Sequence, residues 1–117
     1  MARWKPEKET WWVDCRPLGF GLTIYALFDK TLPFPLGLVW GQTLGKVFLV
    51  YYSFILPWAR RMGVRTKMNE EIFRYHRVIR TGGGTKGGLA FLKAKHYRYD
   101  KVSNEWYLVK RGRRHGE

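Results

Sequence analysis

The chain has 117 residues, with 22 Lys and Arg residues against 9 Asp and Glu residues, and so carries a formal net charge of +13. This length allows one modest hydrophobic core but not a two-lobed enzyme with an enclosed cleft. A single cysteine excludes a disulfide-stapled scaffold and a zinc site built from cysteines. Because 45% of the residues are hydrophobic and 17% are aromatic, the chain is too apolar to be a disordered basic tail. The charge indicates an anionic partner, either nucleic acid or a phospholipid surface.

The charges are unevenly distributed along the chain. Residues 1–30 carry five basic and four acidic side chains, and residues 31–59 carry only Lys46. Residues 60–117 carry sixteen basic and five acidic side chains. The sequence therefore predicts a near-neutral head with an interfacial apolar segment (1–30), a transmembrane segment (31–59) and a basic extramembrane tail (60–117).

Residues 17–28 form an apolar run that is too short to cross a bilayer alone. We expect a short interfacial or re-entrant helix here, with a second membrane crossing as the alternative. Asp14 and Arg16 precede the run and suit the depth of lipid headgroups. Cys15 lies beside the run, so we expect its thiol to be buried and inert.

The charge-poor zone predicts one transmembrane helix over residues 36–56. A helix of this length measures about 31 Å, which matches the roughly 30 Å hydrocarbon core of a bilayer. Trp40 and Trp58 stand near its ends, as interfacial aromatic anchors do, and Arg60 and Arg61 follow as a charged stop. The fold expected is a mainly α membrane protein with a single span.

Lys46 lies near the middle of this span. A charged side chain at that depth costs about 2.5 to 3.5 kcal/mol on insertion scales. Lys46 therefore needs a carboxylate or carbonyl partner on a neighbouring helix, which favours a span packed inside a larger assembly. The alternative is that the zone forms the buried core of a soluble protein docked on a large partner.

Gly37, Gly41 and Gly45 repeat at four-residue spacing within the predicted span. On a helix, these positions lie along one stripe, which lets another helix backbone approach closely. The three glycines therefore form a candidate helix-packing site. The alternative is that they reflect only the high frequency of glycine in membrane segments.

The basic tail shows a helix pattern followed by two strand patterns. Asn69 is a suitable N-cap for a helix that ends at Gly82. The glycine-rich run at 82–88 lacks the order of a phosphate-binding loop, so we interpret it as a flexible connector. Residues 89–99 and 105–111 then predict a β-hairpin joined by a polar turn.

No catalytic, cofactor-binding or metal site is recognisable in the sequence. His76, His96 and His115 do not have the spacing of metal ligands, and Cys15 has no partner visible in the sequence. The acidic residues are too few to suggest a general acid and base pair. These patterns indicate a component of an assembly, not a catalyst.

Two functional classes remain open. In the first, the span is a subunit of a membrane complex, and basic residues just beyond it bind lipid headgroups, with cardiolipin as the structural phospholipid. The candidate headgroup ligands are Arg60, Arg61, Arg65 and Lys67. In the second, the chain is a ribosomal-type protein whose basic residues neutralise RNA phosphates. Its stacking residues would be Tyr97, Tyr99, Trp106 and Tyr107.

The combination of LGLVWGQTLGKVFLVYYSFILPW, the arginine stop ARRMGVR and a basic, aromatic tail resembles the small supernumerary subunits of mitochondrial oxidative-phosphorylation complexes. The glycine stripe is similar to those of ATP synthase subunits at the dimer-forming membrane region. The segment PLGFGLTIYALFDK is similar to parts of short accessory subunits of respiratory complex I. The resemblance implies a subunit that braces an assembly and has no redox centre or catalytic residue.

The sequence thus predicts a non-catalytic accessory subunit that assembles and stabilises a respiratory-chain complex of the mitochondrial inner membrane. Its partners would be other subunits of that complex and anionic lipid, with no small-molecule substrate. Its N-terminus would face the intermembrane space and its basic tail the matrix. The alternatives are an accessory subunit of mitochondrial ATP synthase and an RNA-binding mitochondrial ribosomal protein.

Overall fold

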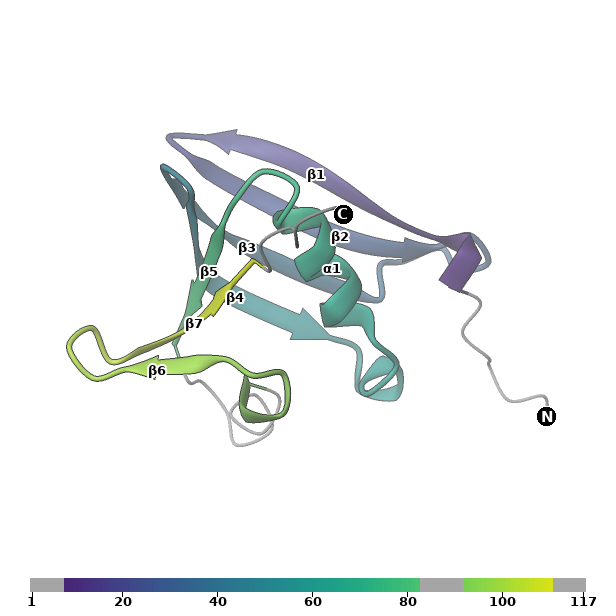
Figure 1. Ribbon diagram of the computed structural model, residues 1–117. Coiled ribbons are helices and arrows are strands. Elements are labelled where there is room, and N and C mark those ends of the chain that lie inside the picture. The colour runs from purple at the N-terminus through teal and green to yellow at the C-terminus, as the bar shows by residue number, and fades with distance from the viewer. Residues whose placement is uncertain (1–7, 83–91, 111–117) are drawn as a thin grey trace, which may run out of the picture.

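Strands, not helices, occupy both apolar zones of the chain. The structure is a computed structural model that describes residues 8–82 and 92–110. Within them, seven strands form one sheet (Figure 1). The strands are β1 (Trp11–Gly19), β2 (Leu22–Asp29), β3 (Gly37–Leu44), β4 (Val47–Ile55), β5 (Val78–Thr81), β6 (Arg98–Asp100) and β7 (Glu105–Val109). The helical elements are η1 (Lys8–Thr10), η2 (Pro57–Ala59) and α1 (Val64–Ile72).

A tight turn divides the predicted span into the hairpin β3–β4. Gly45 has a positive φ of 63°, a conformation that glycine adopts at little cost, and lies between Leu44 and Val47, the last and first paired residues of the two strands. Burial in β3 alternates residue by residue, as in a strand with two unlike faces. A second turn, at Gly19–Phe20–Gly21, likewise converts the predicted interfacial helix into the hairpin β1–β2.

The expected fold class, a mainly α membrane protein with one transmembrane helix, is therefore wrong. None of the helices in the part of the chain described by the structure is long and apolar enough to cross a membrane. The apolar run has the length of a span, but its β-branched and aromatic side chains pack on the two faces of a sheet.

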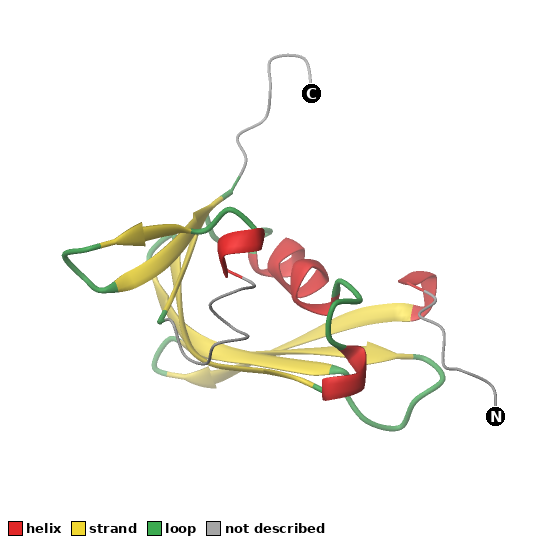
Figure 2. Cartoon of the chain, turned by 90° about the horizontal axis from the view of Figure 1, so that it is seen from below, coloured by secondary structure: helices red, strands yellow, loops and turns green. Residues whose placement is uncertain are grey.

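The sheet has the order β1-β2-β3-β4-β5-β7-β6. All neighbours are antiparallel except β4 and β5, which are parallel and are connected through α1. Figure 2 shows the helices on one side of the sheet formed by β1–β4. The sheet crosses the boundaries expected at residues 30 and 59, since β2 pairs with β3 and β4 pairs with β5.

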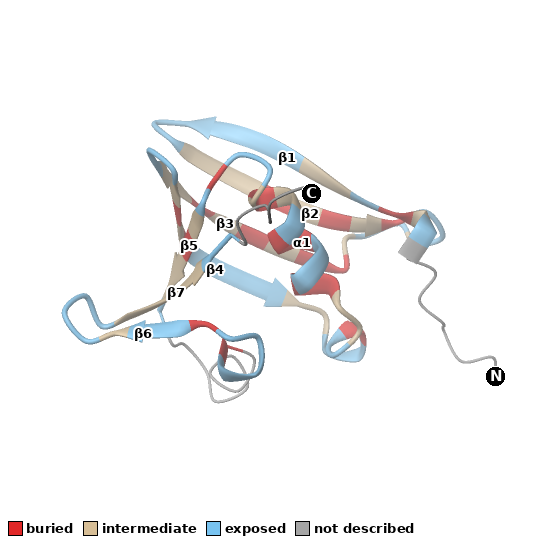
Figure 3. Ribbon diagram, viewed as in Figure 1, coloured by how far each residue is buried: buried red, intermediate tan, exposed pale blue. Residues whose placement is uncertain are grey.

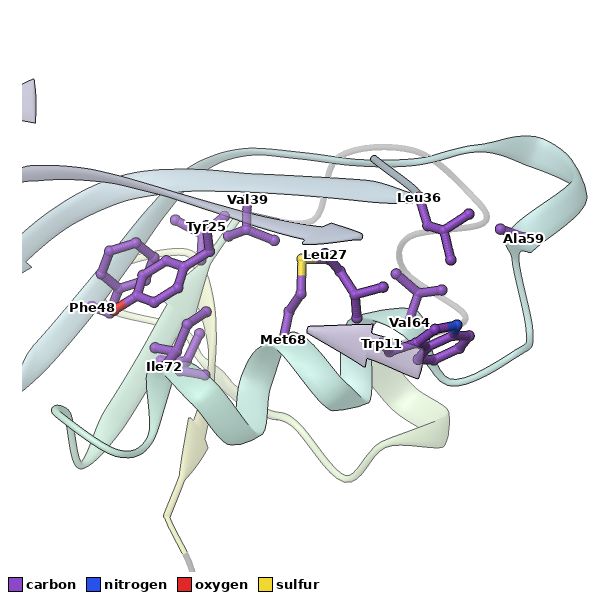
Figure 4. Packing of buried hydrophobic residues seen from close by; sticks show 12 residues of the cluster. Trp11, Tyr25, Leu27, Leu36, Val39, Phe48, Ala59, Val64, Met68 and Ile72 are labelled. Carbon is purple, nitrogen blue, oxygen red and sulfur yellow. The ribbon is translucent and has the colours of Figure 1, made fainter. Parts of the chain in front are cut away.

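The core lies between α1 and one face of β2–β4 (Figure 4). Gly37 allows the helix to come close, because an added Cβ there would lie 3.0 Å from side-chain atoms of both Val64 and Met68. Figure 3 shows this inner face buried and the second half of β4 exposed. The main contributors to the core are Tyr25, Leu27, Val39, Phe48, Val64, Met68 and Ile72.

The tail matches its prediction in part. A hairpin is present as β6–β7, with Asp100 paired to Glu105, but β6 covers only Arg98–Asp100, and residues 92–97 of the strand predicted over 89–99 are not in a strand. The helix predicted from Asn69 to Gly82 is displaced: α1 begins at Val64 and ends at Ile72, and β5 occupies much of the remainder. Most of the glycine-rich run at 82–88 lies outside the described residues.

Asp29 joins the beginning of β1 to the end of β2. Its buried carboxylate accepts hydrogen bonds from Trp11 Nε1 (2.9 Å), Thr10 Oγ1 (3.2 Å), and the Thr31 amide and hydroxyl (2.8 and 2.7 Å). Burial alone would raise the pKa of Asp29, but these hydrogen bonds outweigh burial and lower the pKa.

A bulge in β4 changes which residues face α1. Trp40 pairs with Tyr52, whereas the next residue of β3, Gly41, pairs with Val50, so Tyr51 is an extra residue. A Cβ at Gly41 would overlap the carbonyl oxygen of Leu49 and lie 2.9 Å from its carbonyl carbon. The bulge therefore requires glycine at position 41.

We predict that Asp29→Asn lowers the free energy of unfolding at pH 7 by about 1 to 3 kcal/mol, because buried donors lose a charged acceptor. Asp29 has a lowered pKa in the folded state, so its stabilisation is present above the pKa of the unfolded chain and is lost as pH falls. Urea unfolding should show the difference from the wild type shrinking below about pH 4. Asp14→Asn, at an exposed ion pair, should change stability by less than about 0.5 kcal/mol.

A second prediction concerns the bulge. Gly41→Ala should destabilise the chain by about 2 kcal/mol or more in urea unfolding, because backbone atoms of Leu49 must move. Gly82→Ala is the matched control, since no atom lies within 4 Å of its added Cβ. Equal effects of the two substitutions would contradict the bulge as the cause.

Candidate functional site

β4 pairs with β5 only over its first four residues, which lie opposite the whole of β5. The parallel ladder joins Val47 to Val78 and ends at Val50 and Thr81. β5 ends there, whereas β4 continues to Ile55. The second half of β4 thus presents a strand edge without a ladder partner on the β5 side among residues 8–82 and 92–110. Such an edge offers backbone donors and acceptors to a ligand with amide groups.

The N-terminus of α1 begins beside this edge. Arg61 and Gly63 have positive φ angles of 65° and 86°, which turn the chain sharply into the helix. Gly63 is the N-cap, and no side chain caps the helix. Backbone amides at a helix start and in such turns form a concave, positively polarised surface that binds anions. Arg60 and Arg61 are exposed at the same turn and add two cations.

Arg65 connects the helix start to the strand edge. Its Nη1 donates to Ser53 Oγ at 2.5 Å, so the first turn of α1 lies over the second half of β4. Its Nε donates to Asn69 Oδ1 at 3.0 Å, and Asn69 Nδ2 donates to the Tyr97 hydroxyl at 2.9 Å. The four side chains form a polar network from β4 across α1 to the segment that precedes β6.

The guanidinium of Arg65 is buried. Burial lowers the pKa of Arg65, and the interaction with Tyr97 acts in the opposite direction. Guanidinium groups keep their proton in folded proteins, so Arg65 stays charged at neutral pH. The network therefore holds a positive charge in a region where water screens it weakly.

A cavity of about 190 Å³ adjoins this network between α1 and β7. Asn69 belongs to both the network and the cavity wall. The lining residues are Thr66, Asn69, Glu70, Phe73, Lys95 and Leu108.

The glycines predicted to form a helix-packing stripe lie elsewhere than expected. Gly37 and Gly41 are in β3, and Gly45 is in the turn to β4. The helical stripe does not exist, because Gly37 and Gly41 belong to a strand and Gly45 to a turn, and none of the three lies on a helix. Lys46, predicted to be an intramembrane charge, is exposed at the same turn, where its carbonyl accepts from the Arg77 and Val78 amides.

The predicted headgroup ligands gather at one place. Arg60, Arg61 and Lys67 are exposed at the turn before α1 and in its first turns, whereas Arg65 is buried in the network. Lipid binding, including cardiolipin binding, stays a prediction. Sequence reasoning assigned Asn69 as an N-cap and Tyr97 as an RNA-stacking residue, and it did not predict the network that joins them to Arg65 and Ser53.

The remaining candidate residues do not form a reactive centre. Cys15 is exposed on β1, contrary to expectation, and partial burial of its thiol raises the pKa. His76 is buried, with Nε2 2.9 Å from Thr43 Oγ1 and Nδ1 2.9 Å from the Ile72 carbonyl oxygen. Within the described ranges, no cluster of three His, Cys, Asp or Glu residues could hold a metal ion. His115 lies outside those ranges.

Comparison with known proteins shows that this chain is similar in fold, and not in sequence, to several solved structures. No family model and no curated protein sequence matches the chain. An acetyltransferase of the GNAT family from Staphylococcus aureus is 11% identical, with a TM-score of 0.62 over 76% of this chain and 68% of that one. The ribosomal-protein-S18-alanine N-acetyltransferase of Escherichia coli is 10% identical, with a TM-score of 0.57 over 85% and 76%. Two further matched structures are described as acetyltransferases.

These neighbours correct the expected function. A non-catalytic accessory subunit of the respiratory chain is not supported, since the chain has the fold of GNAT acetyltransferases and the predicted span is a hairpin. The ATP synthase and ribosomal alternatives gain no support from them. The inner-membrane location, its orientation and the exclusion of an enzyme and of a small-molecule substrate are overturned by the same findings. The resemblance to oxidative-phosphorylation subunits stays an untested prediction.

We predict that Tyr97→Phe lowers the free energy of unfolding by about 1 to 3 kcal/mol, because the buried Asn69 amide loses its acceptor. Tyr99→Phe is the control, since the Tyr99 hydroxyl bonds to Asn104 at an exposed site. Chemical denaturation should separate the two variants. If the Tyr97→Phe and Tyr99→Phe variants are equally stable, the hydrogen bond from Asn69 to Tyr97 does not stabilise the contact between α1 and the segment that precedes β6.

Proposed function

We propose that this chain is an acetyltransferase that binds acetyl-CoA along the part of β4 beyond its ladder with β5 and transfers the acetyl group to an amine. The observation that carries the proposal is the end of the β4–β5 ladder at Val50 and Thr81, beside the uncapped N-terminus of α1. The fold shared with GNAT acetyltransferases supports it.

The anionic end of the donor fits the turn before α1. Acetyl-CoA carries phosphate groups, which need donors and positive charge. The backbone amides around Gly63, together with exposed Arg60 and Arg61, supply both. These are the residues that would hold the phosphates.

The central part of the donor fits the edge of β4. The arm of CoA contains two amide groups, which can pair with backbone groups as an added strand would. The edge beyond Val50 has such groups without a ladder partner on the β5 side among the described residues, and its side chains are largely exposed. The length of β4 beyond the ladder thus suits an extended, amide-containing ligand.

The bound donor would supply an acetyl thioester, whose carbonyl carbon accepts the amine nitrogen. The carbonyl oxygen gains negative charge as the amine adds. Arg65 holds a buried positive charge against Ser53 on the β4 edge, which would stabilise that negative charge. The hydrogen bonds to Ser53 and Tyr97 hold the network in position.

The acceptor proposed is an amine, because nitrogen is the atom that the Escherichia coli neighbour acetylates on alanine. The amine must be uncharged to attack and must lose a proton after attack. Neutral amines are favoured near cations, because a nearby positive charge lowers the pKa of an ammonium group. The basic side chains around α1 and β5–β7 would therefore favour the reactive form.

We predict that the double variant Arg60→Ser/Arg61→Ser weakens binding of acetyl-CoA by about tenfold or more, since charge-assisted hydrogen bonds to phosphate are lost. Isothermal titration calorimetry measures the affinity. Release of free CoA thiol, with lysine, spermine or a peptide with a free N-terminus as acceptor, measures transfer.

The double variant Arg16→Ser/Lys46→Ser is the matched control, because it removes the same charge from an exposed residue of β1 and from the exposed turn between β3 and β4, toward the other end of the sheet. It should bind within about twofold of the wild type, apart from a weak long-range effect that salt screens. Failure of the wild type to bind acetyl-CoA at millimolar concentration would refute the proposal.

A further inference from the structure

No helix in the described part of the chain covers the face of β1–β4 opposite α1, which we call the outer face. Figures 1 and 2 show α1 on one face of these strands, and no other described element covers the opposite face. Pairing and alternation assign side chains to this outer face: Trp40 lies across from Tyr52, and Leu38 lies across from Phe54. Their neighbours Val39 and Ser53 face α1, as burial and the bond to Arg65 show.

The outer face is rich in aromatic rings. Trp12 and Phe28 stack with centroids 5.3 Å apart, and Trp40 and Tyr51 meet edge to face at 5.6 Å. Four of its aromatic side chains are substantially exposed: Trp12 (48%), Tyr51 (48%), Tyr52 (50%) and Phe54 (37%). A contiguous apolar surface of this kind on a folded chain marks an interaction site.

The outer face carries almost no charge, although the chain is strongly basic. The strands β1–β4 contain three charged residues, and Asp29 is buried on the α1 side. The other two, Asp14 and Arg16, form an ion pair at 3.0 Å. By contrast, residues 60–82 and 92–110 carry twelve basic and four acidic side chains. A polyanion would bind that basic half, so the outer face needs a neutral, apolar partner.

We propose that the partner is a second copy of this chain, with the outer faces of the two sheets packed together. Four strands about 4.8 Å apart, each eight or nine residues long, present a flat area of about 550 Å² per copy. Two copies would bury about 1,100 Å² before the uneven surface of the side chains is counted, which approaches the lower limit of standard interfaces, about 1,200 Å². Sheets packed face to face form such an interface in β-sandwiches.

Charge selects the symmetry axis of this dimer. A twofold axis parallel to the strands places β1 over β4 of the second copy, and the two basic halves then lie on opposite flanks. An axis perpendicular to the strands would place the basic halves side by side, where they repel. In the first arrangement, the end of the sheet that carries Trp12 and Phe28 lies over the end of β4 of the second copy that carries Phe54.

Sedimentation velocity of the full chain tests the dimer. Wild-type chain at about 100 µM should sediment as a dimer, and association should strengthen with salt, because salt screens repulsion between basic halves. Tyr52→Lys should raise the dimer Kd by about tenfold or more, since it buries a charge in the interface. The control Tyr75→Lys, at a half-exposed tyrosine (59%) after α1, should change the Kd by less than about twofold.

Cross-linking tests the axis. In a Cys15→Ser background, Asp14→Cys/Phe54→Cys should form disulfide-linked dimers on oxidation, whereas Asp14→Cys alone should not, because Asp14 and Phe54 are level with each other in the sheet. The two positions lie three strands apart within one chain, about 14 Å, which is too far for an internal disulfide. Dimers linked by Asp14→Cys alone would overturn the proposed axis.

Two results would overturn the proposal as a whole. One is a wild-type chain that stays monomeric at about 100 µM in 0.5 M salt. The other is a monomer that binds RNA or phosphatidylserine vesicles through the outer face, shown by loss of that binding in Tyr52→Lys but not in Tyr75→Lys. The proposal does not depend on acetyltransferase activity, so acetyl-CoA binding and dimer formation can fail separately.

Discussion

The bulge at Tyr51 is the constraint on which both surfaces of the sheet depend. One extra residue in β4 shifts the alternation of everything after it, so Ser53 faces α1 and Tyr52 and Phe54 face outward. Without the bulge, Tyr52 would lie opposite Val39 and point toward α1, and Ser53 would leave the hydrogen bond to Arg65. Gly41 permits the bulge, because any Cβ would collide with the Leu49 backbone.

The position of α1 follows from a second glycine and determines the candidate site. Gly37 leaves room for Val64 and Met68, so the first turn of α1 can rest on β3 and β4. This contact places the N-terminus of α1 beside the part of β4 that extends beyond its ladder with β5. It also brings Arg65 within hydrogen-bond distance of Ser53. The proposed donor site is therefore a consequence of helix-to-sheet packing, and its polar network is built on an apolar contact.

Local patterns predicted the hairpin β6–β7 but not the sheet to which it belongs. The turn between Asp100 and Glu105 is visible in a few residues, whereas pairing of β4 with β5 joins residues some thirty positions apart. The run at 36–56 matched a membrane span because its length and hydropathy suit one, and a hydropathy pattern does not reveal the turn at Gly45. The network was not predictable, since Asn69 has the chemistry of an N-cap and becomes a mid-helix partner of Tyr97 only through tertiary packing.

The division of charge along the chain is better explained by this fold than by an orientation in a membrane. The strands β1–β4 contain few charged residues, because one face of this part of the sheet packs on α1 and the other face is apolar. The basic residues collect on and around α1 and β5–β7. An anionic donor bound along β4 beyond Val50, beside the start of α1, would offset the repulsion among these cations. The neutral half would meanwhile keep its outer face free of fixed charge, which is the condition for burying that face against another copy.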